Sequence, residues 1–404
     1  MTPVTDAELA RWTAEAEGWL DRHCARRPPG GERASYALFH SLDEAAERAL
    51  VDAAKAWQRT KHAAGYGAIG ADPAIGGDGL GPAHRRAFEE LEARYATPEV
   101  VELVPVSLDL VAPTLGVHGT DEQKARFAAP ILRGEILVCQ LFSEPGAGSD
   151  LAALSCRATR DGNAWTIDGQ KVWTSGAHLA DHGLLLARTD PVSKHGGLTA
   201  FVVPMDAPGV TVRPIRQLTG GTAFNEVFLD GVRVDDDRRV GAVGDGWSVA
   251  LTTLAFERAR SGRGGDPGGG YAEIAATARR TGRTGDPVVR QLVADVYVRE
   301  VVQRRYARQV ALAADAGVVT AEGSIVKLLW LRTLGATATA ATALAGPHLV
   351  AGTGEDRREA WSEHVLGAPG YRIAGGTDEV QRTIIAERLL GLPREPRPPA
   401  GRVG

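Results

Sequence analysis

The sequence predicts an α+β protein built from a helical block, a β block and a second helical block. Apolar residues recur at helical spacing up to residue 137, alternate with polar residues from 138 to 240, and return to helical spacing after 241. We therefore expect an N-terminal helical domain (1–137), a middle antiparallel β-barrel or β-sandwich domain (138–240) and a C-terminal helical bundle (241–404) with a short disordered tail. The length of 404 residues suits two or three such domains.

Three segments of the N-terminal block have helical texture. Residues 42–61 and 83–95 carry apolar residues at helical spacing, and Ser41 is the expected N-cap of the first. Residues 121–132 predict a shorter helix that Thr120 caps.

The middle block predicts short strands separated by turns. The expected strands are 165–167, 171–174, 184–187, 200–203, 210–214 and 226–229. Three dipeptides are expected as turns between strands: Asp161-Gly162, Asp168-Gly169 and Asp230-Gly231.

The C-terminal block predicts helices long enough to form a bundle. They are expected at 247–260, 271–280, 288–314, 324–344 and 379–390. The glycine-rich stretch 262–270 is expected to be a flexible connection, and the Pro- and Arg-rich tail 393–404 to be frayed.

Composition excludes several classes of protein. A net charge of −4, from 46 basic and 50 acidic residues, does not indicate a nucleic-acid or membrane-surface binder. Three cysteines without a C-x-x-C pair exclude a disulfide framework and favour a reducing compartment. Because the N-terminus is acidic and no run of 18 apolar residues occurs, we expect a cytoplasmic protein without a signal peptide or membrane span.

A strand-like run enters the loop 143–150 (SEPGAGSD), which has two glycines at dinucleotide-motif spacing. Leu151 occupies the place of the third glycine, and turn-linked strands follow instead of a helix, so we reject a dinucleotide-binding fold. Two interpretations remain. The backbone and the hydroxyls of Ser143 and Ser149 bind a polar ligand, or the loop only connects two strands.

Three further segments each have two interpretations, one functional and one purely structural. Trp173 and Ser175 either flank a flat cofactor or belong to a β core. Glu257 ends an apolar helical run, where it is either a partly buried base or a solvated carboxylate beside an arginine. The segment 374–379 (AGGTDE) either offers backbone N–H groups to an anion or simply caps a helix.

Other chemistries lack their motifs. His178 and His182 stand four apart, but no carboxylate motif accompanies them, so we do not expect a metal site. Neither a G-x-S-x-G elbow nor a P-loop occurs, which weighs against a hydrolase or an NTPase.

Taken together, four segments resemble the acyl-CoA dehydrogenase family of flavoproteins, in particular branches from high-GC bacteria. They are 143–150 (SEPGAGSD), 171–176 (KVWTSG), 224–229 (FNEVFL) and 376–388 (GTDEVQRTIIAER), and they stand in the order and spacing of the family. The resemblance covers nearly the whole chain, including the helix–β–helix order.

The resemblance implies FAD, held non-covalently at a subunit interface. Ser143 and Ser175 would hydrogen-bond its isoalloxazine ring, with Trp173 packed beside the ring. The full set of implied FAD contacts is Leu141, Ser143, Gly148, Trp173, Ser175, Arg280, Thr377 and Glu379, and the implied substrate contacts are Ser149 and Arg258. Two places depart from the family: Thr281-Gly282-Arg283 replaces the usual Phe-Gly after the arginine, and Gly346-Pro347-His348 matches the glycine-rich FAD segment poorly.

The family removes an α-proton of a thioester with a carboxylate while a hydride leaves the β-carbon for FAD. Most members carry the base as a glutamate where this chain has Gly375, and a minority carry it in a Leu-x-x-Glu-Arg context that residues 254–258 match. The resemblance therefore implies Glu257 as the base. The backbone N–H of Gly375 is left to donate to the thioester carbonyl.

This alternate base position implies a branched, cyclic or steroid-linked acyl-CoA. The family resemblance further implies an electron-transferring flavoprotein as acceptor and, since FAD sites are shared between subunits, a homotetramer or mixed tetramer. Two alternatives stay open: a flavin monooxygenase or oxidase on the same fold, and a mainly structural subunit of a mixed tetramer.

Overall fold

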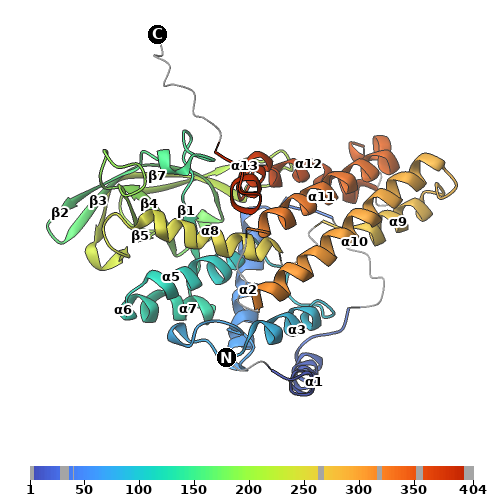
Figure 1. Cartoon of the computed structure of the whole chain (residues 1–404), viewed down its shortest axis with the longest axis horizontal. Coiled ribbons are helices and arrows are strands. Elements are labelled where there is room, and N and C mark those ends of the chain that lie inside the picture. The colour runs from blue at the N-terminus through green and yellow to red at the C-terminus, as the bar shows by residue number, and fades with distance from the viewer. Residues whose placement is uncertain are drawn as a thin grey trace, which may run out of the picture. The chain divides into compact units, whose positions relative to one another are not determined.

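The computed structural model describes residues 4–27, 36–39, 41–262, 268–315, 321–351 and 358–394. Contacts between Cα atoms divide the chain into two compact units, Met1–Glu257 and Arg258–Gly404 (Figure 1). Most of the predicted tail (residues 395–404) and part of the predicted connection 262–270 lie outside the described residues. Within the described ranges, no helix is long and apolar enough to cross a membrane.

The helices of the first unit largely follow the predicted pattern. They are α1 (Asp6–His23), α2 (Glu44–Ala63), α3 (Pro82–Glu92), α4 (Leu103–Pro105), the π-helix Val106–Val111, α5 (Ala112–His118), α6 (Asp121–Gln123), the π-helix Lys124–Ala128, α7 (Ala129–Leu132) and the greater part of α8 (Gly246–Gly262). Short 3-10 turns occur at Pro73–Ile75, Leu151–Ala153, Ala177–Leu179 and Asp236–Arg238.

Caps and helix interiors show where the sequence was informative. Thr120 caps the predicted helix 121–132, as expected, since its hydroxyl accepts from Gln123 N at 3.2 Å. That helix contains a π-helical stretch in its middle. The N-cap of α2 is Asp43, not Ser41, because the Asp43 carboxylate accepts from Ala46 N at 2.8 Å.

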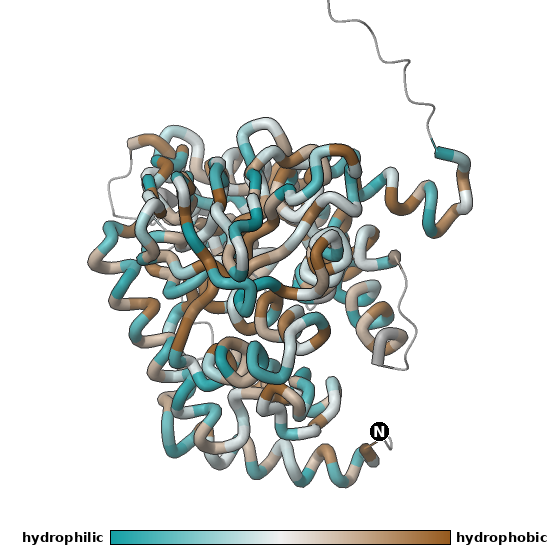
Figure 2. The backbone as a smooth tube through the Cα atoms, turned by 90° about the vertical axis from the view of Figure 1, so that its left-hand side faces the viewer, coloured by the Kyte–Doolittle hydropathy of each residue, from teal (hydrophilic) through white to brown (hydrophobic). Residues whose placement is uncertain are grey.

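Helix α1 was not predicted as a separate element, although its apolar residues recur at helical spacing. Hydrophobic and hydrophilic stretches alternate along this helix, which follows the N label in Figure 2. Its inner face buries Ala16, Trp19 and Leu20, which pack with Phe88 and Leu91 of α3 in one aromatic-rich cluster. This amphipathic face explains why the segment is helical.

Eight strands form one sheet in the first unit. They are β1 (Val138–Leu141), β2 (Arg157–Asp161), β3 (Ala164–Ser175), β4 (His182–Arg188), β5 (Leu198–Pro204), β6 (Val210–Ile215), β7 (Phe224–Asp235) and β8 (Arg239–Val240). The order across the sheet is β6-β7-β3-β2-β4-β5-β8, with β1 paired to β4. The predicted β domain is thus confirmed, but β1 and β2 pair with β4 in parallel, since no hairpin joins either strand to β4.

Only one of the three Asp-Gly dipeptides is a turn between strands. Asp161-Gly162 joins β2 to β3, as expected. Asp168-Gly169 and Asp230-Gly231 instead lie inside β3 and β7, where the register shifts between Ile167 and Gly169. The two dipeptides face each other, and Asp168 Oδ1 accepts from Gly231 N at 2.9 Å. They form a β-bulge that bends the two long strands without ending them.

The sheet buries both of its faces along β4 and β5. Leu184, Leu186 and Val202 pack with the helical residues of α5, α7 and α8. Their neighbours, such as Leu185 and Phe201, face the opposite way and pack with β3 and β7. This alternation produces a sheet folded over on itself, with helices covering its outer face.

The second unit is a bundle of helices. It contains the end of α8, then α9 (Tyr271–Arg280), α10 (Pro287–Asp315), α11 (Gly323–Ala345), 3-10 turns at Gly346–Leu349 and Arg358–Trp361, α12 (Ser362–Tyr371), α13 (Asp378–Ile384) and the π-helix Ile385–Leu389. The helix predicted at 271–280 coincides with α9, and α12 was not predicted. Helices α10 and α11 lie side by side in this unit (Figure 1).

Candidate functional site

The first group of predicted site residues gathers where β1 ends beside β3. Val172 N of β3 donates to Ser143 O at 2.9 Å, so the loop 143–150 leaves the sheet next to the segment 172–175. Ser143, Ser149, Trp173 and Ser175 therefore come from two adjacent stretches of backbone.

A buried ion pair fastens these two stretches together. Lys171 Nζ lies 2.7 Å from Glu144 Oε1, and the two side chains are 0% and 4% exposed. Lys171 also donates to Phe142 O at 3.1 Å. Glu144 accepts further hydrogen bonds from the N–H groups of Ser155 and Cys156. Burial alone would raise the pKa of Glu144, but the ammonium and these donors outweigh it and hold the pKa below its usual range.

Trp173 has the most unusual backbone in the first unit. Its φ of 62° is the only positive value at a non-glycine residue among those described. It sits in the second register shift of β3, between Lys171 and Thr174. The indole is 60% exposed, so the interpretation of Trp173 as a β-core tryptophan is wrong. A bulky residue in this strained conformation is typical of functional sites.

The hydroxyls around this indole are available to a ligand. Within the described residues, the structure shows no hydrogen-bond partner for the hydroxyl of Ser143, Ser149 or Ser175. Gly148 has open space where a Cβ would be. Leu141, in contrast, is 0% exposed in the core, so neither its side chain nor its backbone is accessible to a cofactor in this structure.

These residues fit an isoalloxazine ring. The ring is flat and carries hydrogen-bond acceptors along its edge, and the site offers an exposed flat indole with free hydroxyl donors on neighbouring backbone. The buried hydroxyl of Thr174, which also lacks a partner in the described structure, adds another polar atom at this place.

A hydrogen-bonded network of polar side chains contacts the end of β3 at Thr174. Sequence reasoning did not identify this network. Asn225 Nδ2 donates to Thr174 O at 3.0 Å, while Asn225 Oδ1 lies 3.2 Å from His178 Nδ1. His178 Nε2 in turn lies 3.0 Å from Glu47 Oε2. The network therefore links α2 to the strand end beside Ser175. No short sequence motif indicates this network, because Glu47 and Asn225 are far apart in the sequence.

Glu257 lies on α8 and is half-buried. It is the last residue of the first unit. The helix is anchored near its start, where a Cβ on Gly246 would lie 2.6 Å from Thr199 N. One turn before Glu257, the buried Thr253 hydroxyl lies 3.1 Å from that of Thr114 on α5. Glu257 thus continues the same helix face as Thr253, since the two are four residues apart.

The second group of predicted residues lies in the second unit, around a turn before α13. Gly375 and Gly376 both have a left-handed backbone, with φ of 64° and 86°. Thr377 caps α13, and its hydroxyl accepts from Val380 N at 3.3 Å. The capping interpretation of this segment is thus confirmed for Thr377, and it does not exclude a ligand at the turn.

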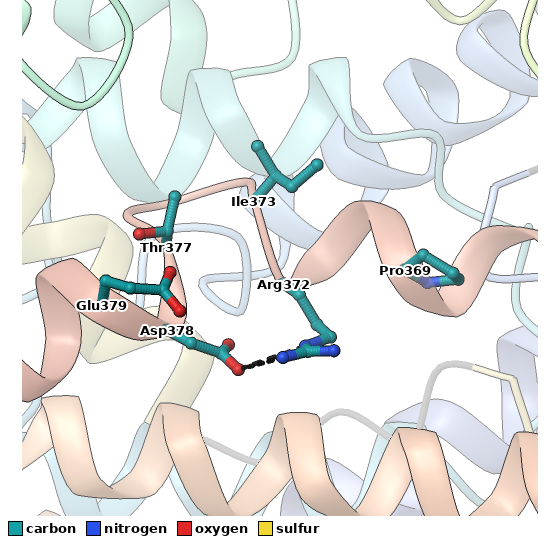
Figure 3. A pocket seen from close by; sticks show the side chains of 6 residues that line it. All are labelled: Pro369, Arg372, Ile373, Thr377, Asp378 and Glu379. Atoms are coloured by element: carbon teal, nitrogen blue, oxygen red, sulfur yellow. Dashed lines mark hydrogen bonds and ion pairs between the residues drawn. The ribbon is translucent and has the colours of Figure 1, made fainter.

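A hollow of about 280 Å³ adjoins this turn (Figure 3). In Figure 3, Arg372 and Asp378 point toward each other, and their ion pair measures 2.8 Å. The residues that line the hollow are Pro369, Arg372, Ile373, Thr377, Asp378 and Glu379. The two predicted FAD contacts Thr377 and Glu379 therefore share one concave surface.

Two further predicted residues of this unit, Arg280 and Arg258, do not line the hollow. Arg280 ends α9, where its Nη2 donates to the Thr277 hydroxyl at 3.2 Å. Arg258 is half-buried and lies near Gly323, at the start of α11. The structure does not bring Arg280 or Arg258 into the lining of the hollow at Thr377.

Two observations bear on other chemistries. Among the described residues, no group of three or more His, Cys, Asp or Glu side chains is arranged to hold a metal ion. All three cysteines are free, and burial raises the pKa of Cys139 to about 12 and that of Cys156 to about 11. These two buried thiols are therefore unreactive near neutral pH.

Comparison with known proteins places the chain in a family. Residues 37–135, 139–232 and 244–390 match the N-terminal, middle and C-terminal domain models of acyl-CoA dehydrogenases. The acyl-CoA dehydrogenase IpdE1 of Mycobacterium tuberculosis is 39% identical over 96% of this chain and 99% of its own length. The chain belongs to the acyl-CoA dehydrogenase family, whose members are FAD-dependent flavoproteins.

Solved structures agree with this assignment. The Tcur3481-Tcur3483 steroid ACAD has a TM-score of 0.75 at 26% identity, covering 98% of this chain and all of that one. The ChsE4-ChsE5 complex from Mycobacterium tuberculosis has a TM-score of 0.74 at 25% identity, covering 98% and 100%. The protein is an oxidoreductase of the acyl-CoA dehydrogenase class.

Proposed function

We propose that this protein uses FAD to introduce an α,β double bond into an acyl-CoA whose acyl chain is branched, cyclic or steroid-linked. The observation that carries the proposal is the exposed, strained Trp173 on a strand that adjoins Ser143 and ends at Ser175, two serines whose hydroxyls have no partner among the described residues. The buried Glu144–Lys171 ion pair supports the proposal, because it holds the loop and the strand that carry these residues in a fixed arrangement.

The proposed FAD contacts divide between the two units. In the first unit, Ser143 and Ser175 donate to the ring and Trp173 packs beside it. Gly148 contributes backbone, and the buried Leu141 ends the strand from which this loop leaves. In the second unit the proposed contacts are Arg280, Thr377 and Glu379, and the substrate contacts are Ser149 in the first unit and Arg258 in the second. The chemistry that bound FAD supplies is acceptance of the hydride that leaves the β-carbon.

The chain's own residues carry the proton chemistry in this proposal. The Glu257 carboxylate takes the α-proton of the thioester, and the electron pair left on the α-carbon forms the new double bond. The Gly375 N–H donates to the thioester carbonyl oxygen, which gains negative charge as the proton leaves. Gly375 itself has no side chain that could take a proton.

Two findings support the proposed substrate class. A structural neighbour at 26% identity is described as a steroid ACAD. In addition, glycine at position 375 leaves free the volume that a glutamate side chain would fill next to the acyl chain. We extend the proposal to lipid β-oxidation as the pathway type.

The partners and location belong to the same proposal. We propose an electron-transferring flavoprotein as acceptor and a tetramer as the assembly, either of one chain or of two kinds of chain. The mixed form has support because the structural neighbour ChsE4-ChsE5 is a complex of two proteins. Three free cysteines support a cytoplasmic location.

Anaerobic titration tests the proposed function. The protein, purified with its flavin, is titrated in turn with butyryl-CoA, isobutyryl-CoA and a CoA thioester of a steroid side chain, and the flavin absorbance is followed. We expect the steroid or branched thioester to bleach the flavin at the lowest concentration. If butyryl-CoA reacts best, the substrate class is wrong; if no thioester bleaches a fully loaded flavin, the dehydrogenase proposal fails.

A further inference from the structure

A buried lysine lies directly behind the Gly375–Gly376 turn. Lys327 of α11 is 3% exposed, and its Nζ donates to Ala374 O and, at 2.8 Å, to Gly376 O. Both carbonyls therefore point at the same ammonium group. Neither the sequence motifs nor the comparisons assign a role to this lysine.

A second buried side chain holds the same turn. Gln381 is 1% exposed, and its Nε2 donates to Gly375 O at 3.0 Å and to Gly376 O at 3.3 Å. Three consecutive carbonyls, from Ala374 to Gly376, thus accept hydrogen bonds from two buried side chains. A turn of two left-handed glycines has many alternative conformations, and these bonds select one of them.

The planarity of the peptide bond then fixes the opposite side of the turn. In a trans peptide the C=O and the following N–H point in opposite directions. Because Ala374 O and Gly376 O face Lys327, the N–H groups of Gly375 and Thr377 face away from it. In the described part of the chain, no acceptor is found for the N–H of Gly375.

From this geometry we infer that Lys327 is a positioning residue for the reaction. Its ammonium holds the two carbonyls so that the Gly375 N–H is presented, unpaired, to the thioester carbonyl oxygen. The inference rests on the proposed function, since that function supplies the thioester. It explains how a backbone donor stays fixed at a position where glycine gives the chain most freedom.

Crystal structures of the variant protein test the orientation itself. Lys327→Met removes the ammonium but keeps a similar length, and Ser324→Ala is the matched control. Ser324 lies one turn earlier on α11, is buried, and has a hydroxyl with no hydrogen-bond partner in the described part of the chain. We expect the 374–375 peptide to rotate in Lys327→Met and to keep its orientation in Ser324→Ala. An unchanged peptide in Lys327→Met overturns the inference.

Carbon NMR of a bound thioester tests the consequence. The probe is acetyl-CoA labelled with ¹³C at the carbonyl, which cannot be dehydrogenated because it has no β-carbon. In the wild-type holoenzyme we expect a downfield carbonyl shift, which Lys327→Met abolishes and Ser324→Ala retains. With a reactive thioester, kcat should fall about 10- to 100-fold while KM changes little, since the donor acts mainly in the transition state.

The outcomes separate the inference from the proposed function. A downfield shift that persists in Lys327→Met overturns the positioning role and leaves the proposed function intact. No shift in the wild-type holoenzyme overturns the Gly375 donor and the proposed function with it, whatever the variant shows. If Lys327→Met does not fold, Gln381→Leu removes the bonds to Gly375 O and Gly376 O and leaves Ala374 O on Lys327, so the 374–375 peptide should keep its orientation. A rotated 374–375 peptide in Gln381→Leu would overturn the positioning role of Lys327.

Discussion

The sheet end around Trp173 and the turn at Gly375 both present hydrogen-bond donors, but they fix them differently. At the sheet end the donors are side-chain hydroxyls, and a buried lysine–glutamate pair fastens the two strands that carry them. At the turn the donor is a backbone N–H, and a buried lysine holds the carbonyls on its far side. In both places a buried lysine organises backbone at a distance from the proposed chemistry.

The two regions are therefore sensitive to different kinds of substitution. The sheet end depends on charge neutralisation in the core, so a broken pair there costs folding free energy. The turn depends on which of several glycine conformations is selected, so a change there alters orientation more than stability.

The largest stability effect is expected at the sheet end. Lys171→Met leaves the Glu144 carboxylate buried without its cation and should lower the free energy of unfolding by about 3–5 kcal/mol. Arg233→Met, which breaks an ion pair with both partners at least 60% exposed, should cost less than about 1 kcal/mol. Urea unfolding of both variants measures this. Equal losses would mean that the buried pair does not fasten the two strands.

The two tryptophans of β3 should behave in opposite ways. Trp173→Gly removes the positive-φ strain and an exposed side chain, so the free energy of unfolding of the flavin-free protein should change by less than about 1 kcal/mol. Flavin affinity should fall about tenfold or more, as measured by fluorescence titration. Trp165→Ala, at a 3% exposed position, should cost about 3–5 kcal/mol. A large loss of stability in Trp173→Gly would show that the indole is structural.

At the turn, adding a methyl group should cost little stability. Gly375→Ala places a Cβ on a φ of 64° and should destabilise the protein by about 1 kcal/mol while keeping the N–H. Gly335→Ala is the matched control, since it lies inside α11 with open space around its Cα and should stabilise by up to about 1 kcal/mol. Thermal unfolding of the two variants measures both the expected loss and the expected gain of stability. A stabilising Gly375→Ala would contradict the left-handed turn.

The smallest effect concerns an ion pair at the edge of the sheet and depends on pH. Hydrogen bonds from Arg239 and from the Trp165 indole hold the pKa of Asp236 at about 2. The folded pKa lies below the unfolded value of 3.8, so this stabilisation is present above pH 3.8 and is lost as pH falls toward 2.

Asp236→Asn should therefore cost up to about 1 kcal/mol near neutral pH, and the cost should shrink below pH 3.8. Unfolding curves of wild type and variant at several pH values measure the difference. A difference that stays constant down to pH 2 would show that the carboxylate charge does not matter.

The sequence predicted the order of the blocks because periodicity reports which faces are buried. Residues 271–280 form α9 as predicted, since their apolar spacing and flanking glycines agree. Asp168-Gly169 and Asp230-Gly231 were wrongly predicted as turns, because a β-bulge and a hairpin turn favour the same residues. Only the pairing of β3 with β7 distinguishes the two structures, and neither dipeptide contains information on that pairing.

Sequence reasoning proposed site residues where a motif is local and missed supporting residues where no local motif exists. Ser143, Ser175 and Thr377 stand inside short motifs, so the resemblance singled them out as candidates. Lys327 was missed although it is a lone charge in the apolar run 324–331 (SIVKLLWL), which is a readable signal of a buried lysine with partners. Its partners Ala374 and Gly376 are almost 50 residues away, so no local pattern names them.

The most direct test of the central claim is exchange of the substrate's α-proton in heavy water. Isobutyryl-CoA is incubated anaerobically with flavin-loaded wild type, Glu257→Gln and Gly375→Ala, and deuterium at the α-carbon is measured by mass spectrometry. With Glu257 as the base, exchange should fall by about 10²–10⁴-fold in Glu257→Gln and less than tenfold in Gly375→Ala. Undiminished exchange in Glu257→Gln with full flavin content would contradict the assignment of Glu257 as the base.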